Sequence, residues 1–196
     1  MSREAPIAKG MKLIHFAPLA FVLASLASCA SPRHSAWQAY ENGRCASAAE
    51  RWEELALAGD SDAQFLLGLL HDEGQLGVVD AVEAVRWYTL AAQQGHAPAQ
   101  CNLGLCHYEG RGTLRSHEQA AQWFERAAAQ GFAKAQNNLA VMHLFGQAPD
   151  SNPERARELL SQAAAAGDPK AATLLPRLAA LEPSATREQV LATLAR

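Results

Sequence analysis

The chain has 196 residues, of which 49% are hydrophobic but only 7% aromatic, and its formal net charge is −3. This length suggests one domain or two. Because most of the apolar excess is alanine, the strongest helix former, the composition favours an all-α fold. The mildly negative charge and the lack of a clustered basic face argue against nucleic-acid binding.

The first 28 residues have the parts of a secretory signal peptide. Basic residues precede an apolar stretch from Leu13 to Leu26, and small residues follow it. The stretch is too short for a membrane span, which needs about 20 apolar residues. Met11 is an alternative to Met1 as the start, because it gives a more compact leader. The segment therefore predicts export.

The end of the apolar stretch, Leu26-Ala27-Ser28-Cys29, resembles the lipobox of bacterial lipoproteins. The resemblance implies cleavage before Cys29 and lipidation of that cysteine, which would anchor the mature protein in a membrane. The residue after this cysteine is Ala30 and not an aspartate. By the same resemblance, this implies that the protein is in the outer membrane and faces the periplasm. The alternative is ordinary cleavage nearby and release of a soluble periplasmic protein. Residues 29–36 are expected to form a tether.

Residues 37–181 contain a sequence repeat with a period of about 36 residues. Three full copies occupy 59–94, 95–130 and 131–166, and partial copies lie at each end. A period in this range is typical of stacked-repeat architectures. The column that divides one copy from the next holds Gly59, Gly95, Gly131 and Gly167.

Each copy contains two amphipathic helices, which we call helix A and helix B. In the first copy, apolar and small residues recur at helical spacing over 62–73 and again over 81–93. The glycine column predicts the C-terminal end of each helix B. Polar residues of the types that cap helices predict its N-terminal end; they are Asp80, Ser116 and Asn152.

Gly68 and Gly104 lie inside helix A, where a glycine costs about 1 kcal/mol relative to alanine. Because this glycine recurs, we expect helix B to approach helix A closely there, with its aromatic side chains packed beside the glycine. The third copy has Ala140 at this position.

The two ends of the array depart from the full copies. At the N-terminal end, residues 37–42 are expected to form a short helix A, and Ser47 with Glu50 predicts a capping box for the next helix. At the other end, 169–181 predicts a fourth helix A without its partner. Residues 184–196 predict a capping helix over the exposed stacking face, which could instead occupy the groove of the array.

These columns resemble those of the Sel-like repeat family, which is related to the tetratricopeptide repeats. The third copy departs from the family pattern, because Leu159 and Leu160 replace its aromatic pair. The matching residues of the first copy are Ala63, Leu67, Gly68, Gly74, Ala84, Trp87, Tyr88, Ala91, Ala92 and Gly95. Those of the second copy are Ala99, Leu103, Gly104, Gly110, Ala120, Trp123, Phe124, Ala127, Ala128 and Gly131.

The resemblance implies an αα-hairpin repeat solenoid, a right-handed superhelix with a concave groove. It also implies a non-catalytic scaffold or adaptor that binds a protein or peptide partner. The candidate groove contacts are amide side chains that we expect to be exposed on helix A; the alternative is that they only satisfy neighbouring backbone groups. These residues are Gln64, Gln100, Gln136, Asn102 and Asn138.

His71, His107 and His143 share one column of the repeat. Packed helices lie about 8–10 Å apart, whereas zinc needs nitrogen ligands at about 2.1 Å. We therefore predict no metal site and expect these histidines to line the core or the groove. No catalytic motif or nucleophile–base pair is recognisable, so we predict no catalytic residue and no cofactor.

Four cysteines are present, and three remain if Cys29 is acylated. Cys101 and Cys106 lie about 140° apart around one expected helix, so they cannot pair with each other, and we interpret both as packing residues. The sequence leaves open whether Cys45 is oxidised.

Two other functions of the protein also stay open. One is an enzyme acting on β-lactams or cell wall, as in cysteine-rich Sel-like proteins, and the other is a purely structural envelope lipoprotein.

Overall fold

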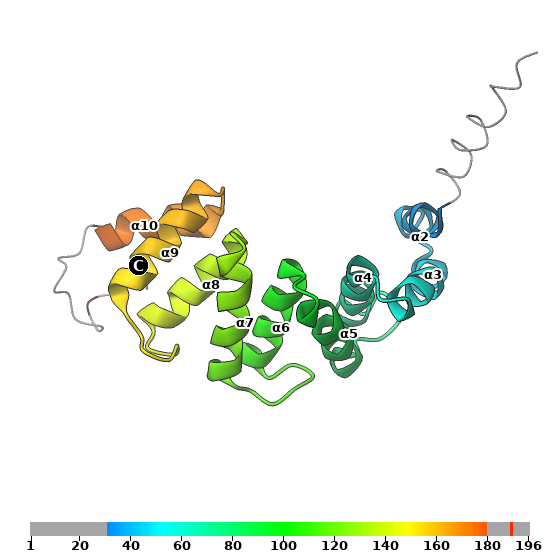
Figure 1. Cartoon of the computed structure of the whole chain (residues 1–196), viewed down its shortest axis with the longest axis horizontal. Helices are drawn as coiled ribbons and strands as arrows, with labels where there is room; N and C mark the ends of the chain where they lie inside the picture. The colour runs from blue at the N-terminus through cyan, green and yellow to red at the C-terminus, as the bar shows by residue number, and fades with distance from the viewer. Residues whose placement is uncertain (1–30, 180–188, 190–196) are drawn as a thin grey trace, which may run out of the picture.

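The computed structural model describes residues 31–179 and Gln189, and within them it has α-helices and no strand (Figure 1). None of the described helices is long and apolar enough to cross a membrane. The helices are α2 (Pro32–Glu41), α3 (Cys45–Leu57), α4 (Ser61–Asp72), α5 (Ala81–Gln93), α6 (Ala97–Glu109), α7 (His117–Ala129), α8 (Ala133–Leu144), α9 (Pro153–Ala165) and α10 (Pro169–Ala179).

The helices pack in chain order along a curved row, each against the helix before it and the helix after it (Figure 1). Even-numbered elements are the A helices, and α3, α5, α7 and α9 are the B helices. In the half of Figure 1 that contains the first repeat, α2 and α4 lie on the inner side of the curve, and α3 and α5 lie on its outer side. This arrangement confirms the predicted all-α solenoid of helical hairpins.

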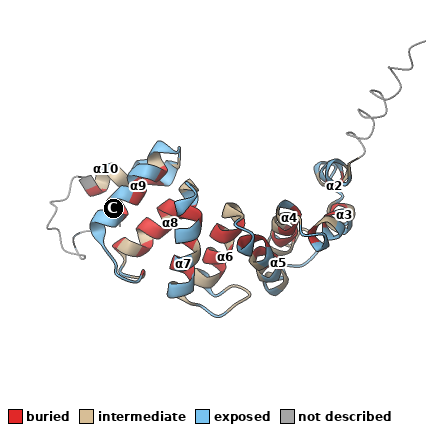
Figure 2. Ribbon diagram, in the orientation of Figure 1, coloured by how far each residue is buried: buried red, intermediate tan, exposed pale blue. Residues whose placement is uncertain are grey.

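Buried residues lie between neighbouring helices along the whole row rather than in one central core (Figure 2). The A and B helices approach most closely at the glycines of helix A. A Cβ atom added to Gly68 would lie 2.5 Å from the Tyr88 ring, and one added to Gly104 would lie 2.7 Å from the Phe124 ring. The predicted close approach is therefore confirmed, because no other residue fits there without a shift of the ring.

The predicted ends of the B helices are confirmed. Asp80 accepts a hydrogen bond from the Glu83 amide at 2.9 Å, and Ser116 and Asn152 cap α7 and α9 in the same way. The dividing glycines have φ angles between 81° and 94°, the left-handed region that favours glycine. They are Gly59, Gly95, Gly131 and Gly167.

Two expectations for the N-terminal copy are wrong. Helix α2 begins at Pro32, with Ser31 as its N-cap, so residues 32–36 are helical rather than part of a tether. A serine N-cap followed by a proline at the first helical position is a strong start signal that the prediction overlooked. Helix α3 begins at Cys45 without a side-chain cap, which places Ser47 inside its first turn and excludes the predicted capping box.

Several predicted segments lie outside the described residues. They are the signal peptide 1–28, the lipidation site Cys29 and, apart from Gln189, the capping helix 184–196.

Candidate interaction surfaces

Three of the predicted groove contacts are buried structural residues. Their exposed fractions are 4%, 4% and 5%, so the expectation that they face the groove is wrong. Each side-chain amide donates a hydrogen bond to a carbonyl in the last turn of the preceding helix B, which also accepts one from the backbone amide of the dividing glycine. The alternative, that these amides satisfy backbone groups, is therefore correct. The residues are Gln64, Gln100 and Gln136.

The other two predicted contacts, Asn102 and Asn138, are half-buried. Asn102 forms a hydrogen bond with the hydroxyl of Tyr88, whose pKa is raised by burial and by the nearby carboxylate of Asp72. Asn138 occupies the equivalent position one repeat later, where Phe124 replaces Tyr88 and offers no hydroxyl. The amide of Asn138 donates a long hydrogen bond of 3.8 Å to the sulfur of Cys101. Gln136 borders a hollow between α7 and α9, and Asn138 borders an open hollow beside α6.

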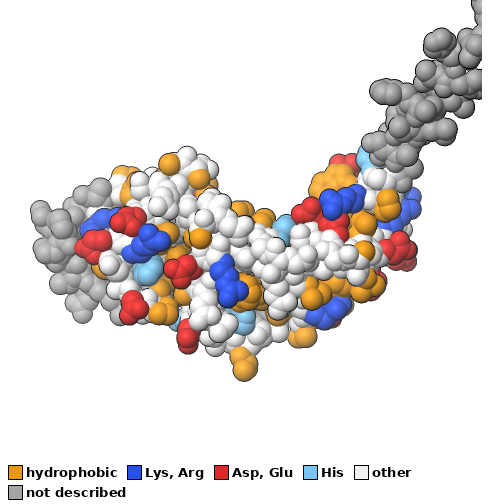
Figure 3. Space-filling view, viewed as in Figure 1, with side chains coloured by type: hydrophobic (Ala, Val, Ile, Leu, Met, Phe, Trp, Pro, Cys, Tyr) orange, Lys and Arg blue, Asp and Glu red, His pale blue; other side chains and the backbone are white. Residues whose placement is uncertain are grey.

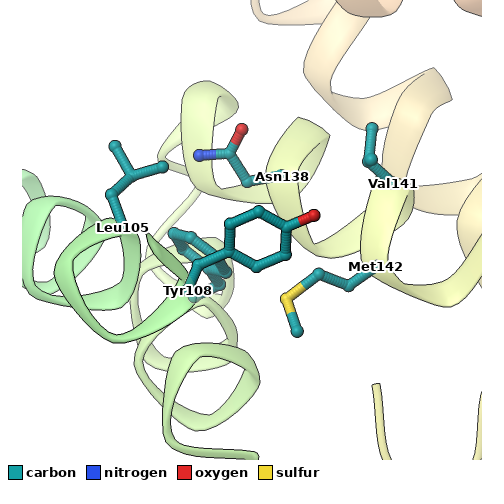
Figure 4. Close-up of a pocket in the computed structure, with 6 residues that line it drawn as sticks. Leu105, Tyr108, Asn138, Val141 and Met142 are labelled. Carbon is teal, nitrogen blue, oxygen red and sulfur yellow. The ribbon is translucent and has the colours of Figure 1, made fainter. Parts of the chain in front are cut away.

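This hollow, which we call the Tyr108 hollow, lies between the A helices α6 and α8 (Figure 4). Its volume is about 90 Å³, and apart from the amide of Asn138 and the hydroxyl of Tyr108 its walls are apolar. In Figure 4 the Tyr108 ring lies across the hollow, between Leu105 and the side chains of α8. The lining residues are Leu105, Tyr108, Phe124, Asn138, Val141 and Met142.

Comparison with the preceding repeat explains why the Tyr108 hollow exists. There, the hydroxyl of Tyr88 lies between Asn102 and Asp72 and donates to the Asp72 carboxylate at 3.3 Å. One period later Phe124 replaces the tyrosine and brings no hydroxyl. In place of the aspartate stands Tyr108, and its own hydroxyl donates to Gln147 Oε1 at 3.0 Å. The space between these residues is therefore left open.

We call the side of the row that is bordered by neighbouring A helices, where the Tyr108 hollow lies, the A-helix face. A second, larger hollow of about 440 Å³ lies at the N-terminal end of this face, between α2, α3 and α4. Trp37 is 45% exposed there and lies beside Trp52, with the ring centroids 6.3 Å apart. Arg33 borders it and forms ion pairs with Asp60 and Asp62. Figure 3 shows the inner side of the curved row as a broad concave surface between its two ends.

The histidine column lies near the C-terminal ends of the A helices, and His71, His107 and His143 are all half-buried. Within the residues that the structure describes, no group of histidine, cysteine and acidic side chains could hold a metal ion. Cys101 and Cys106 are buried, and burial raises the pKa of each thiol to about 11. The thiolate is therefore disfavoured, and both cysteines act as packing residues.

Sequence reasoning missed most of the Tyr108 hollow. It selected Asn138 but not Leu105, Val141 or Met142, because apolar residues on helix A were all assigned to the core. The replacement of Tyr88 by Phe124 in the same column was the available signal, since it removes a hydroxyl while keeping the ring.

A family model for the Sel1 repeat matches residues 61–96, 97–132 and 133–168. The chain belongs to the Sel1 repeat family. These repeats start two residues later than the copies defined above, close to the first residue of each helix A. Sel1 repeats are commonly protein-interaction scaffolds and are generally non-catalytic.

A solved structure of a Sel1 repeat protein shows the same fold. A Sel1 repeat protein from Oxalobacter formigenes is 30% identical, with a TM-score of 0.66 over 78% of this chain and 68% of that one. The protective antigen c5321, present in uropathogenic Escherichia coli strains, has an SLR fold and is 24% identical. Its TM-score is 0.48, over 88% of this chain and 46% of that one. A search of curated proteins gave no match.

Proposed function

We propose that this Sel1 repeat protein is a non-catalytic scaffold that binds a protein partner on its A-helix face. The observation that carries the proposal is the Tyr108 hollow, an apolar recess bordered by the amide of Asn138. A recess that is formed before binding reduces the cost of ordering the surface. The half-buried Asn138 amide could pair with the backbone of a segment that lies over the hollow.

The size of the hollow indicates what it binds. At about 90 Å³ it is smaller than the cavities of about 150 Å³ that hold benzene, so it suits one branched aliphatic side chain. Its lining residues include no histidine, carboxylate, serine, lysine or cysteine, and the hydroxyl of Tyr108 donates to Gln147, which supports binding without chemistry. The hollow beside Trp37 offers a larger apolar contact on the same face.

Site-specific photo-crosslinking in the producing cell tests this proposal. A photoreactive phenylalanine analogue at position 105 in the full chain should give one discrete crosslinked product. The matched control is the analogue at the exposed position Gln93 on α5, which lies outside the Tyr108 hollow and outside the hollow beside Trp37. Equal products from both positions, or none from position 105, would contradict binding on the A-helix face.

We also propose that the scaffold is an outer-membrane lipoprotein facing the periplasm, anchored through Cys29. The support is the signal-peptide pattern of residues 1–28 and the lipobox-like sequence that ends in this cysteine. Cells that produce the full chain should incorporate a palmitate analogue into it, and Cys29→Ser should abolish labelling. Equal labelling of the variant would exclude this cysteine as the anchor, and no labelling of either would favour a soluble periplasmic protein.

A further inference from the structure

Two repeats contain a ladder of paired glutamine side chains. Gln64 Oε1 accepts a hydrogen bond from Gln94 Nε2 at 2.7 Å, and Gln100 Oε1 accepts one from Gln130 Nε2 at 2.8 Å. The donor in each pair is the C-cap residue of the helix B in the same repeat. The buried amide is thus held on both sides, because its nitrogen also donates to the preceding helix B.

The third repeat lacks the donor of this ladder. The C-cap of α9 is Ala166, which has no amide, although its backbone angles match those of the glutamine C-caps. Gln136 is the acceptor of this repeat, and within the described part of the chain its Oε1 is buried without a hydrogen-bond partner. Its Nε2 is divided between the Ala128 carbonyl and Gln162 Oε1, both at 3.3 Å.

A groove lies over this amide, between the B helices α7 and α9, and we call it the Gln136 groove. One hollow of about 290 Å³ includes Gln136 and Gln162, and another of about 280 Å³ extends to His143. Glu125 from α7, Leu139 from α8 and Arg155 from α9 line both hollows, which therefore lie next to each other along the Gln136 groove.

The length and charge of the Gln136 groove limit its ligand. From Gln136 to His143 along α8 is about 10 Å, the span of about three residues of extended chain. The acidic Glu125 and the basic Arg155 face the groove from different helices, and Arg155 also pairs with Glu158 at 3.1 Å. A neutral segment fits this balance better than a charged one.

We propose that the Gln136 groove binds a neutral extended peptide segment whose glutamine side chain donates an N–H to Gln136 Oε1. The protein itself shows which group fits, since Gln94 and Gln130 place a primary carboxamide against the same oxygen of the same buried residue in the two preceding repeats. The exposed side chain of Gln162 covers the amide and rotates away as the ligand enters. This site is independent of the A-helix face.

The test is a nitrogen-15 NMR titration of the full chain with acetyl-Ala-Ala-Gln-Ala-Ala N-methylamide, which carries one primary carboxamide. We expect saturable shifts of the side-chain amide signals of Gln136 and Gln162 at millimolar concentrations. The signals of Gln64 and Gln100 serve as internal controls and should not move. The same peptide with glutamate, which has no side-chain N–H, should bind at least about tenfold more weakly.

Ala166→Gln supplies the missing donor from within and should lower the affinity for the glutamine peptide at least about tenfold. The fold should tolerate this variant, because glutamine occupies the same C-cap position in two other repeats. Ala165→Gln, one residue earlier, is the matched control and should leave the affinity unchanged. The absence of saturable shifts, equal binding of the glutamate peptide, or unchanged affinity of A166Q would each overturn the proposal.

Discussion

At the scale of single residues, copies of the repeat differ in ways that can be tested by transferring a residue from one copy to another. Ala166→Gln transfers the glutamine C-cap into the third repeat and should give Gln136 Oε1 its hydrogen bond. One such bond contributes about 0.5–1.5 kcal/mol, so the free energy of unfolding should rise by that amount in urea titrations. A value for A166Q no higher than that of Ala165→Gln would contradict this.

Gly104→Ala tests the close approach of α6 and α7. The added Cβ would lie 2.7 Å from the Phe124 ring. Overpacking of this kind costs about 1–3 kcal/mol, and the gain in helix propensity offsets about 1 kcal/mol of it. We expect a net loss of up to about 2 kcal/mol in the free energy of unfolding, measured in urea.

The third repeat indicates which change should rescue Gly104→Ala. It combines Ala140 with Leu160 in these two columns, and both residues are buried there. In a Phe124→Leu background, Gly104→Ala should therefore be neutral or stabilising, and a double-mutant cycle should show coupling between the two sites. Additive effects would show that the ring does not require the glycine.

The direction in which a side chain points was harder to predict than its position in the repeat. The recurring glycines of helix A predicted a close approach, because a costly residue inside a helix needs a packing reason. The glutamines gave no comparable signal, since a polar residue in helix A fits an exposed position equally well. Only the stacking of α4 on the end of α3 shows that Gln64 turns inward to the Ala56 carbonyl.

At the scale of elements, the start of α6 depends on an unusual cap. His96 Nδ1 accepts a hydrogen bond from the Ala99 amide at 3.2 Å, and the ring lies against Phe65 with centroids 4.8 Å apart. Burial lowers the pKa of His96, although the carboxylate of Asp62, 3.3 Å from Nε2, opposes this shift. Protonation would convert the accepting nitrogen into a donor and remove the cap.

The pKa of His96 is lower in the folded state than in the unfolded state, so the unfolded chain binds more protons as the pH falls. The stabilisation is present above the unfolded pKa of about 6.5 and is lost as the pH falls through the folded pKa. His96→Asn keeps an acceptor at the cap without titrating in this range. The loss of unfolding free energy between pH 7.5 and pH 5.5 should therefore be smaller in H96N.

Chemical denaturation at both pH values measures this difference. His143, whose pKa is also lowered by burial, keeps part of the dependence in H96N. An unchanged dependence in H96N would mean that the cap does not titrate.

Element boundaries were predicted well where a cap and a period agreed. Helix α5 spans Ala81–Gln93, as the spacing predicted, because Asp80 marks its start. The first helix was predicted too short. Residues 32–36 show no repeat period, and the Ser31-Pro32 start signal was not taken into account. Local capping energy, which does not depend on the repeat, explains that difference.

At the scale of the whole molecule, the 36-residue period of the sequence was enough to predict the order of the helices. Each helix pair buries its apolar face against its neighbours, so the columns that pack must recur. The interaction surfaces could not be predicted in this way, because they arise where a column is broken. Phe124 opens the Tyr108 hollow, and Ala166 leaves Gln136 without its donor.

The most direct test of partner binding on the A-helix face is photo-crosslinking from position 105 in a Phe124→Tyr variant. The added hydroxyl would occupy the Tyr108 hollow where the preceding repeat places the hydroxyl of Tyr88. We expect F124Y to keep the thermal stability of the unmodified protein and to lose at least about nine-tenths of the crosslinked product. A folded F124Y that crosslinks with undiminished yield would contradict binding at this hollow.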